Sequence, residues 1–281
     1  ATSGTTTITS ETSGGYAIDH DGTFTHNNGT VLITTPATTL LDLLATGNLY
    51  NLTINHASCV ARIVSHSTID NDVTVTAGTL NTAYDVNVTV TGDVSVSGTF
   101  GLAEESGAHS FGSLTIESGG THIATSGTTT ITSETSGGFA MVDQGTFTHN
   151  NGTIQIGDGS TSVGSGTHTK VDTFYNLTVN MASTTVMVLM RPNSGSTMTV
   201  LNNVTVQNGV LTKNSHTNTF DFGGLVTVGI GGGSLAAHID STTSGTATDN
   251  FGALTILTDG KYTQPTTTNV SSIRNVGGTI A

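Results

Sequence analysis

The chain has few large and few charged side chains. Of its 281 residues 5% are aromatic and 9% are charged, and tryptophan is absent. Such a composition cannot fill a thick core with large side chains. It can fill a thin one with valine, isoleucine and leucine, provided that many short strands each contribute one or two. Threonine is abundant, and branching at Cβ suits it, like valine and isoleucine, to a pleated surface. The sequence therefore predicts an all-β protein with a narrow interior.

Basic residues, long apolar runs and cysteine pairs are also missing. With 6 lysines and arginines and a formal net charge of −13, the chain has no basic cluster for phosphate groups, so we expect no nucleic-acid partner. No apolar run approaches the length of a membrane-spanning helix, so we expect no membrane insertion. The single cysteine, Cys59, cannot form an internal disulfide. Thr184 occupies the matching place in the repeat described below, which favours a small buried side chain over a reactive thiol.

Short catalytic signatures are absent as well. The sequence contains no G-x-S-x-G, no H-E-x-x-H, no phosphate-binding P-loop and no Cys/His metal pattern. It begins at Ala1, inside a repeat copy, with neither an initiator methionine nor a signal-peptide pattern, and we expect a processed product or a fragment of a larger protein. We predict that the chain is not an enzyme and needs no cofactor.

An internal repeat organises what is present. Residues 1–31 and 124–154 are nearly identical. Further along, YNLTIN matches YNLTVN, NDVTVTAGTL matches NNVTVQNGVL, and FGSLTI matches FGALTI, while the offset between matches grows from 123 to 140 residues. Insertions that accumulate between strands suit a solenoid, in which extra residues bulge from a corner. We assign copy 1 to residues 1–123, copy 2 to 124–250 and the truncated start of a third copy to 251–281.

Triplets such as VTV and LTI recur throughout the chain, with two aliphatic residues around one threonine. This period of two is typical of a strand with one buried face, and glycine, asparagine, aspartate and serine separate the triplets as corner residues. We predict a parallel β-helix, or β-solenoid, with corner insertions. Tandem β-sandwiches are the alternative. Residues 36–47 (PATTLLDLLATG) could instead form a short helix, with Thr35 as its cap and Pro36 at its first position.

The best preserved polar residues between the copies form one motif, His-Asn-Asn-Gly. Asparagine and glycine tolerate a left-handed backbone, so we predict a structural corner whose asparagine amides hydrogen-bond from turn to turn. A glycan-binding stripe is the alternative. The motif comprises His26, Asn27, Asn28 and Gly29 in copy 1, and His149, Asn150, Asn151 and Gly152 in copy 2.

Several acidic groups are candidates for acid/base or metal chemistry. Asp19-His20-Asp21 is the densest cluster, but copy 2 reads Val142-Asp143-Gln144 there, which favours solvated loop residues. Glu104 and Glu105 are adjacent, so on a strand they would face opposite sides. A lone site on residues of one copy, such as Asp221 or Asp240, is a further possibility.

Two acidic segments have the oxygen-rich character of Ca²⁺ loops. They are Asp70-Asn71-Asp72 and the Gly-Asp-Gly-Ser segment that contains Asp158. Neither continues into the spacing of an EF-hand or of a calcium-binding nonapeptide repeat. Corner turns explain them equally well, so we expect no cofactor and keep bound Ca²⁺ as the alternative.

The succession GTFTHNNGT, YNLTI or YNLTV, DVTVT and FGSLTIESGGT resembles the Thr/Gly/Asn-rich repeats of very large surface-exposed proteins, found in bacterial adhesin-like proteins and in phage tail-fibre or virion appendage proteins. The resemblance covers nearly the whole chain. It implies a structural or adhesive role on a virion or cell surface, outside the cytoplasm. The implied partners are other copies of the chain, other fibre or virion subunits, and surface glycans. The alternative is a carbohydrate-binding or polysaccharide-degrading β-helix tailspike.

Overall fold

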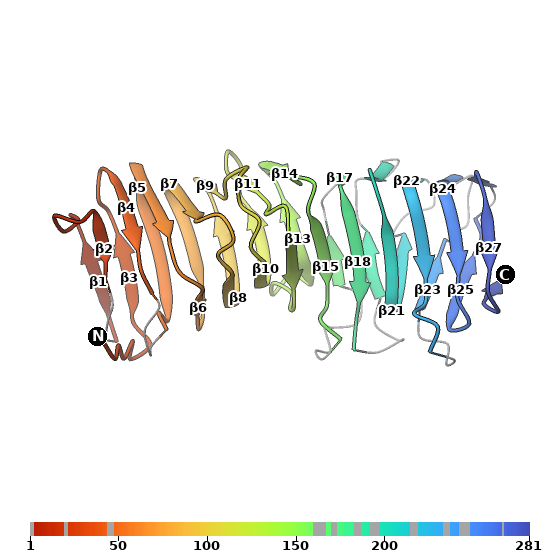
Figure 1. Cartoon of the computed structure of the whole chain (residues 1–281), viewed down its shortest axis with the longest axis horizontal. Helices are drawn as coiled ribbons and strands as arrows, with labels where there is room; N and C mark the ends of the chain where they lie inside the picture. Colours follow the sequence, from red (N-terminus) through yellow and green to blue (C-terminus); the bar gives the residue numbers. More distant parts are fainter. Residues whose placement is uncertain are drawn as a thin grey trace. The chain divides into compact units, whose positions relative to one another are not determined.

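The chain forms a β-solenoid of parallel strands stacked in about 10 turns, seen here in a computed structural model (Figure 1). The structure describes residues 3–19, 22–43, 48–159, 167–169, 173–182, 187–190, 197–213, 219–232, 237–241, 248–265 and 267–281. This part of the chain contains no helix, and therefore none that could cross a membrane. The predicted parallel β-helix is confirmed, whereas the tandem sandwiches, which need antiparallel strands, are not found.

Contacts within the chain define two compact units. Unit 1 comprises residues 1–129 and 143–152, and unit 2 comprises residues 130–142 and 153–281. Strands β12 (Thr128–Ile131) and β13 (Phe139–Asp143) are divided between the units. Unit 1 holds β1 (Thr5–Ile8), β2 (Tyr16–Ile18), β3 (Thr30–Ile33), β4 (Thr38–Leu41), β5 (Asn51–Ile63), β6 (Ser67–Ile69), β7 (Val73–Thr82), β8 (Val88–Val96), β9 (Thr99–Phe100), β10 (His109–Ile116), β11 (Thr121–Ile123) and β14 (Thr146–Thr148).

Unit 2 contains the remaining strands. They are β15 (Thr153–Ile156), β16 (Thr167–Thr169), β17 (Thr173–Phe174), β18 (Asn176–Asn180), β19 (Met187–Met190), β20 (Thr197–Val200), β21 (Val204–Lys213), β22 (Thr219–Val228), β23 (Ala237–Asp240), β24 (Thr248–Ile256), β25 (Gly260–Thr263), β26 (Thr267–Val270), β27 (Ile273–Asn275) and β28 (Thr279–Ile280).

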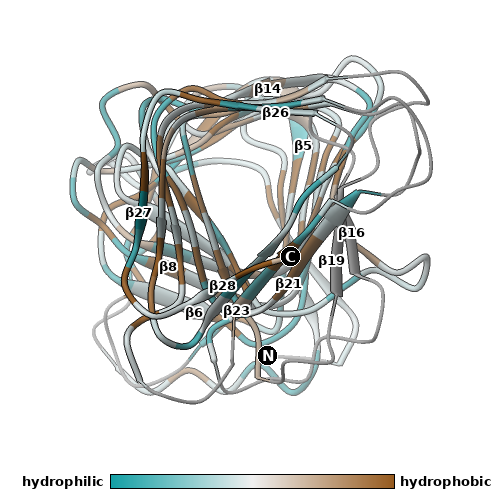
Figure 2. Cartoon of the chain, turned by 90° about the vertical axis from the view of Figure 1, so that its right-hand side faces the viewer, coloured by the Kyte–Doolittle hydropathy of each residue, from teal (hydrophilic) through white to brown (hydrophobic). Residues whose placement is uncertain are grey.

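Each turn has three faces, and the longer strands bend from one face to the next. In the last turn of unit 2, β26, β27 and β28 form three separate sides (Figure 2). In unit 1 the first face is a ladder in which β3, β5, β7, β8 and β10 pair in register. Its inward residues are aliphatic and lie 20 or 21 residues apart: Val31, Leu52, Val73, Val94 and Leu114, and two positions later Ile33, Ile54, Val75, Val96 and Ile116.

The aliphatic residues of the predicted triplets point inward. Val88 and Val90 are each 1% exposed, whereas Thr89 between them is exposed. The same alternation holds at Leu52–Ile54, where the two aliphatic residues are buried. Because the register of each parallel ladder aligns these positions, every turn covers the apolar residues of the next. The predicted inward face of the triplets is confirmed.

Unit 2 repeats this arrangement with longer turns. The inward residues of its first face include Leu177, Val204, Val226 and Leu254, which lie 27, 22 and 28 residues apart along the chain. The interior also holds stacked aromatic rings that composition did not predict. The centroids of Phe220 and Phe222 are 4.9 Å apart, and those of Phe222 and Phe251 are 5.3 Å apart. Seven of the 14 aromatic residues are buried inside the solenoid, where ring stacking stabilises the contacts between turns.

The helix suggested for residues 36–47 is not found, so that prediction was wrong. Residues Thr38–Leu41 form β4, which pairs in parallel with the second half of β5, Leu40 opposite Arg62. Residues 44–47 lie outside the described residues. The ladder pairs residues 38–41 with β5 on one side and with β2 on the other, and this tertiary pairing outweighs the local helix signal.

Cys59 is buried, as its alignment with Thr184 predicts. It is 1% exposed, and its Sγ lies 3.6 Å from Thr35 Oγ1. Burial raises the pKa of the Cys59 thiol above its ordinary value. Since the thiolate is the reactive form, this setting disfavours reactivity.

Candidate functional site

The His-Asn-Asn-Gly motif forms the same tight turn in both copies. Asn27 and Asn28 have φ angles of 51° and 57°, and Asn150 and Asn151 have 47° and 57°. In each turn the histidine Nδ1 accepts the backbone N–H of the residue two positions on, at 2.9 Å in copy 1 and 3.1 Å in copy 2. Asparagine adopts the left-handed conformation at low cost, so it suits these positions.

The two copies differ just before this turn. In copy 2, residues 146–148 form β14, which pairs with β11, whereas residues 23–25 of copy 1 are described but lie in no strand. The amide-to-amide hydrogen bonds expected for the motif are found at other asparagines. Asn71 Nδ2 donates to Asn51 Oδ1 at 2.9 Å, and Asn202 Nδ2 donates to Asn176 Oδ1 at 2.9 Å. These two turn-to-turn amide contacts therefore involve the YNLTIN and YNLTVN segments.

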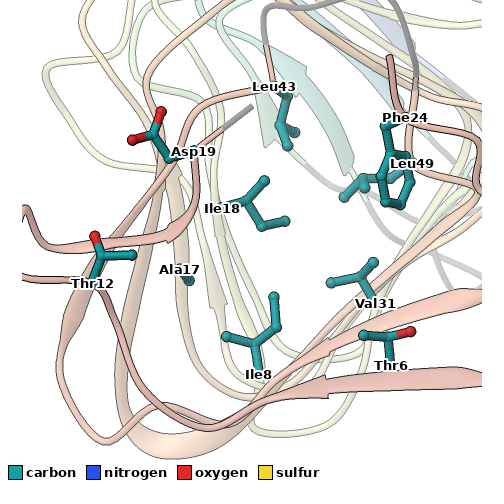
Figure 3. A pocket seen from close by; sticks show the side chains of 10 residues that line it. All are labelled: Thr6, Ile8, Thr12, Ala17, Ile18, Asp19, Phe24, Val31, Leu43 and Leu49. Atoms are coloured by element: carbon teal, nitrogen blue, oxygen red, sulfur yellow. The ribbon is translucent and has the colours of Figure 1, made fainter. Parts of the chain in front are cut away.

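Asp19 lies at the edge of an apolar cavity in unit 1 of about 460 Å³ (Figure 3). Ile8, Ile18 and Leu43 line this cavity. His20 and Asp21, the other members of the predicted cluster, lie outside the described residues. At the matching place in copy 2, Asp143 Oδ1 accepts the backbone N–H of Gly145 at 3.0 Å, as a turn residue does. Among the described residues, the polar groups of the cavity wall are the hydroxyls of Thr6 and Thr12 and the carboxylate of Asp19.

The side chains of Asp70-Asn71-Asp72, considered above as an alternative Ca²⁺ segment, form hydrogen bonds within the protein. Asp70 accepts one from His26 Nε2 at 3.1 Å and one from Asn48 Nδ2 at 2.6 Å. Asp72 Oδ1 accepts the backbone N–H of Asp93 at 2.9 Å. Asp158 lies just after β15. No group of three or more metal-ligating side chains occurs within the part of the chain that the structure describes.

The two lone carboxylates considered as sites of copy 2 lie on different strands. Asp221 lines a shallow hollow with Asn250 and Asn269, which occupy the same ladder position on the following turns. Asn269 Nδ2 donates to Asn250 Oδ1 at 2.9 Å, so these amides bond to each other. Asp240 lies on β23 beside Thr212 and Thr263 in the ladder. The structure does not bring the two carboxylates to one ladder position.

Two histidines, His109 and His122, lie inside the solenoid in unit 1. Together with the neighbouring rings of Phe100 and Phe111 they form what we call the histidine cluster. His122 is fully buried, and its Nδ1–H donates to the carbonyl of Phe100 at 3.0 Å. The rings of Phe100 and His122 lie 5.4 Å apart. Burial lowers the pKa of His109 to about 4 and that of His122 to about 3, so both are neutral at pH 7.

Glu105 is a buried carboxyl group near the same interior. Glu104 and Glu105 lie outside any strand, between β9 and β10, and Glu104 is exposed whereas Glu105 is buried. Glu105 Oε1 accepts the backbone N–H of Thr82 at 2.5 Å, while Oε2 has no hydrogen-bond partner among the described residues. Burial raises the pKa of Glu105 to about 7, against the smaller lowering effects of its hydrogen bonds and of Arg62.

These shifts predict a pH dependence of unit 1. The unfolded chain binds protons at His122 below about pH 6.5, whereas the folded chain does so only near pH 3. The free energy of unfolding should therefore fall on acidification through this window, by up to about 1.4 kcal/mol per pH unit for one histidine. His122→Phe should flatten that dependence, measured by urea unfolding between pH 7 and 4.

Glu105 should change the free energy of unfolding with pH in the direction opposite to His122, so it serves as a control. Its folded pKa lies above the ordinary value of 4.5, so the folded state binds more protons between about pH 4.5 and 7, and the free energy of unfolding falls as pH rises there. Glu105→Gln should remove this opposing slope and steepen the loss of stability on acidification. Equal pH profiles for the native chain and both variants would contradict the buried titration.

Unit 2 has an interior cluster of a different kind, which we call the lysine cluster: Lys213, Asp249, Tyr262 and Thr268. Lys213 Nζ forms an ion pair with Asp249 Oδ1, and both side chains are 0% exposed. Tyr262 O–H donates to Asp249 Oδ2 at 3.1 Å and lies 2.8 Å from Thr268 Oγ1. Burial and the neighbouring carboxylate raise the pKa of Tyr262 above its usual range, so the phenol keeps its proton.

Neither cluster was predicted from the sequence, although the repeat matches contain a signal for both. Extending the match between NDVTVTAGTL and NNVTVQNGVL by two residues aligns Thr82 with Lys213. Extending the match between FGSLTI and FGALTI in both directions aligns His109 with Asp249 and His122 with Tyr262. These residues lie in phase with inward aliphatic or aromatic positions, where a polar side chain is unexpected. Both units thus place polar groups at the same interior positions, with different chemistry.

No protein-family model, no curated protein and no solved structure matches this chain.

Proposed function

We propose that this chain is a non-catalytic structural segment of a fibre on a virion or cell surface, serving as a rigid spacer, surface cover or adhesive module. The observation that supports this most is the continuous parallel ladder within each unit, whose inward residues are buried turn after turn. In such a solenoid each turn is held by its neighbours, which gives a repetitive segment stiffness without a separate globular core.

The placement of the titratable groups also supports a structural role. The residues whose pKa values depart most from their ordinary range are Glu105, His109, His122 and Tyr262, and all four are buried. An enzyme needs such groups in a cleft that substrate can reach. Outward ladder positions carry threonine, serine and asparagine instead, such as Thr68, Thr89 and Ser110 on the ladder of β6, β8 and β10, which we call the third face of unit 1.

Surface exposure of the protein tests this function directly. Immunogold labelling with antibodies against this chain should decorate the outside of intact cells of the producing organism or of its virus particles. Labelling that appears only after the cells are permeabilised would contradict the proposal. We further propose that its partners are other copies of the chain, other fibre subunits, or surface glycans.

The polysaccharide-active alternative predicts a different result. The folded chain incubated with a panel of acidic and neutral polysaccharides should release no reducing ends and no unsaturated products. Turnover that disappears in Asp221→Asn or in Asp240→Asn would overturn the non-catalytic assignment. Tyr84 is 67% exposed and is an aromatic platform on which a sugar ring could stack. Loss of glycan-array binding in Tyr84→Ala, without turnover, would support an adhesive module.

A further inference from the structure

We propose that Lys213 and Asp249 become joined by an amide bond between their side chains, a covalent cross-link within unit 2. Lys213 is the last residue of β21, and Asp249 lies in β24, 36 residues later in the sequence. Lys213 Nζ contacts Asp249 Oδ1, and neither side chain has any exposed surface. The two functional groups of an amide are therefore held together in a place that water does not reach.

The pair lies in the interior of unit 2, beside aromatic rings. Lys213 Nζ lies 4.8 Å from the centroid of the Phe220 ring. In the ladder of β22, β24 and β26, Phe220 precedes Asp249 and Thr268 follows it. Burial of charge in such a medium is costly, and transfer of one proton from the ammonium to the carboxylate leaves a neutral amine beside a neutral carboxylic acid. These are the forms that react.

Tyr262 is placed to assist the reaction. Its O–H donates to Asp249 Oδ2, the oxygen that does not face Lys213 Nζ. Because the phenol has one proton and gives it to this contact, the Thr268 hydroxyl donates to the Tyr262 oxygen and orients it. A fixed donor at Oδ2 stabilises the negative charge that this oxygen acquires when Cγ becomes tetrahedral.

The reaction needs no other reactant. The ammonium of Lys213 gives one proton to Asp249 Oδ1, and the Nζ lone pair then forms a bond to Cγ while the carbonyl electrons move to Oδ2. A second proton passes from Nζ to Oδ1, the bond between Cγ and Oδ1 breaks, and its electron pair leaves with the oxygen as water. The products are one amide and one water molecule.

Proximity makes this dehydration feasible. Two groups fixed in contact behave as if at effective concentrations on the order of 10⁵ M or more. The folded interior also lacks the water that would solvate the ionised reactants and reverse the reaction. The cross-link closes the segment between β21 and β24, so a force applied along the chain could not extend the residues between them.

Unit 1 serves as an internal control. At the matching positions it has Thr82, His109 and His122 in place of Lys213, Asp249 and Tyr262, and these side chains cannot form an amide with one another. We therefore expect one cross-link per chain, confined to unit 2.

Intact-mass spectrometry of the folded chain tests the proposal. The native chain should be lighter than its sequence mass by one water molecule, and protease digestion should give a branched peptide that contains both Lys213 and Asp249. Lys213→Arg keeps the positive charge but has no nucleophilic amine, so it should show the full mass. Cyclisation of Asp-Gly or Asn-Gly segments also changes mass, but it would persist in Lys213→Arg.

Kinetics provide a second measurement that does not depend on a variant losing its fold. After refolding from denaturant, the loss of water should follow folding, and Tyr262→Phe should slow it by about tenfold or more while circular dichroism remains that of β structure. A folded native chain that keeps its full sequence mass after prolonged incubation would overturn the proposal, and so would an equal mass loss in Lys213→Arg.

Discussion

Val90→Asp should unfold unit 1, whereas Thr89→Asp should leave it nearly unchanged. Val90 is 1% exposed and lies between Ile69 and Phe111 in the ladder of the third face. A carboxylate at this position would be buried against apolar neighbours without a partner. The cost should be about 4 kcal/mol or more, a large part of the stability of an ordinary domain.

Thr89 is the matched control because it lies on the same strand, one residue away and on the outer side. Its ladder neighbours are Thr68 and Ser110, so an aspartate there meets water and hydroxyl groups. The expected change is within about 0.5 kcal/mol. Urea unfolding followed by circular dichroism measures both variants. Equal destabilisation by the two substitutions would mean that the assignment of inner and outer faces is wrong.

Gly101→Ala should destabilise the chain more than Gly119→Ala, its matched control. Gly101 has a φ of 105°, and a Cβ there would overlap the backbone oxygen of Ile123 on the next turn. Gly101 N–H also donates to the carbonyl of Leu80 at 2.9 Å on the turn before. An alanine must therefore displace backbone on the adjacent turn in addition to adopting an unfavourable φ, at a combined cost of about 3 kcal/mol or more.

Gly119 separates the two contributions. It has a φ of 85°, but a Cβ at this position meets open space. Gly119→Ala should therefore cost only the backbone strain, about 1 kcal/mol. Thermal unfolding monitored by circular dichroism gives the comparison. If Gly119→Ala destabilised the chain as much as Gly101→Ala, close packing between turns at Gly101 would not be the cause.

The inner and outer faces of the solenoid could be predicted from the sequence because they depend on local periodicity. In a strand, side chains alternate between two sides, so a triplet such as Val88-Thr89-Val90 already distinguishes buried from exposed positions. The internal repeat also indicated the order in which the turns stack, since parallel stacking places equivalent residues of successive turns side by side. The turn at Asn27 and Asn28 followed from the tolerance of asparagine for positive φ.

Local signals were insufficient where pairing decided the outcome. The segment that contains β4 has a helix-like start at Thr35 and Pro36, yet it is a strand because β5 supplies its hydrogen-bond partners. The amide contacts were likewise expected at the Asn27 turn but occur between Asn51 and Asn71. Which side chains meet between turns depends on the register of the ladder, and the sequence of one turn does not contain that information.

The sequence by itself determined a β-solenoid with an aliphatic interior, because period-two patterning and repetition are properties of the chain alone. Only the tertiary structure decided which polar residues share the interior. Lys213 and Asp249 are 36 residues apart, and their contact requires the bends of β22 and the stacking of successive turns. Such contacts form only when the turns stack in register, because residues far apart in the sequence become neighbours only then.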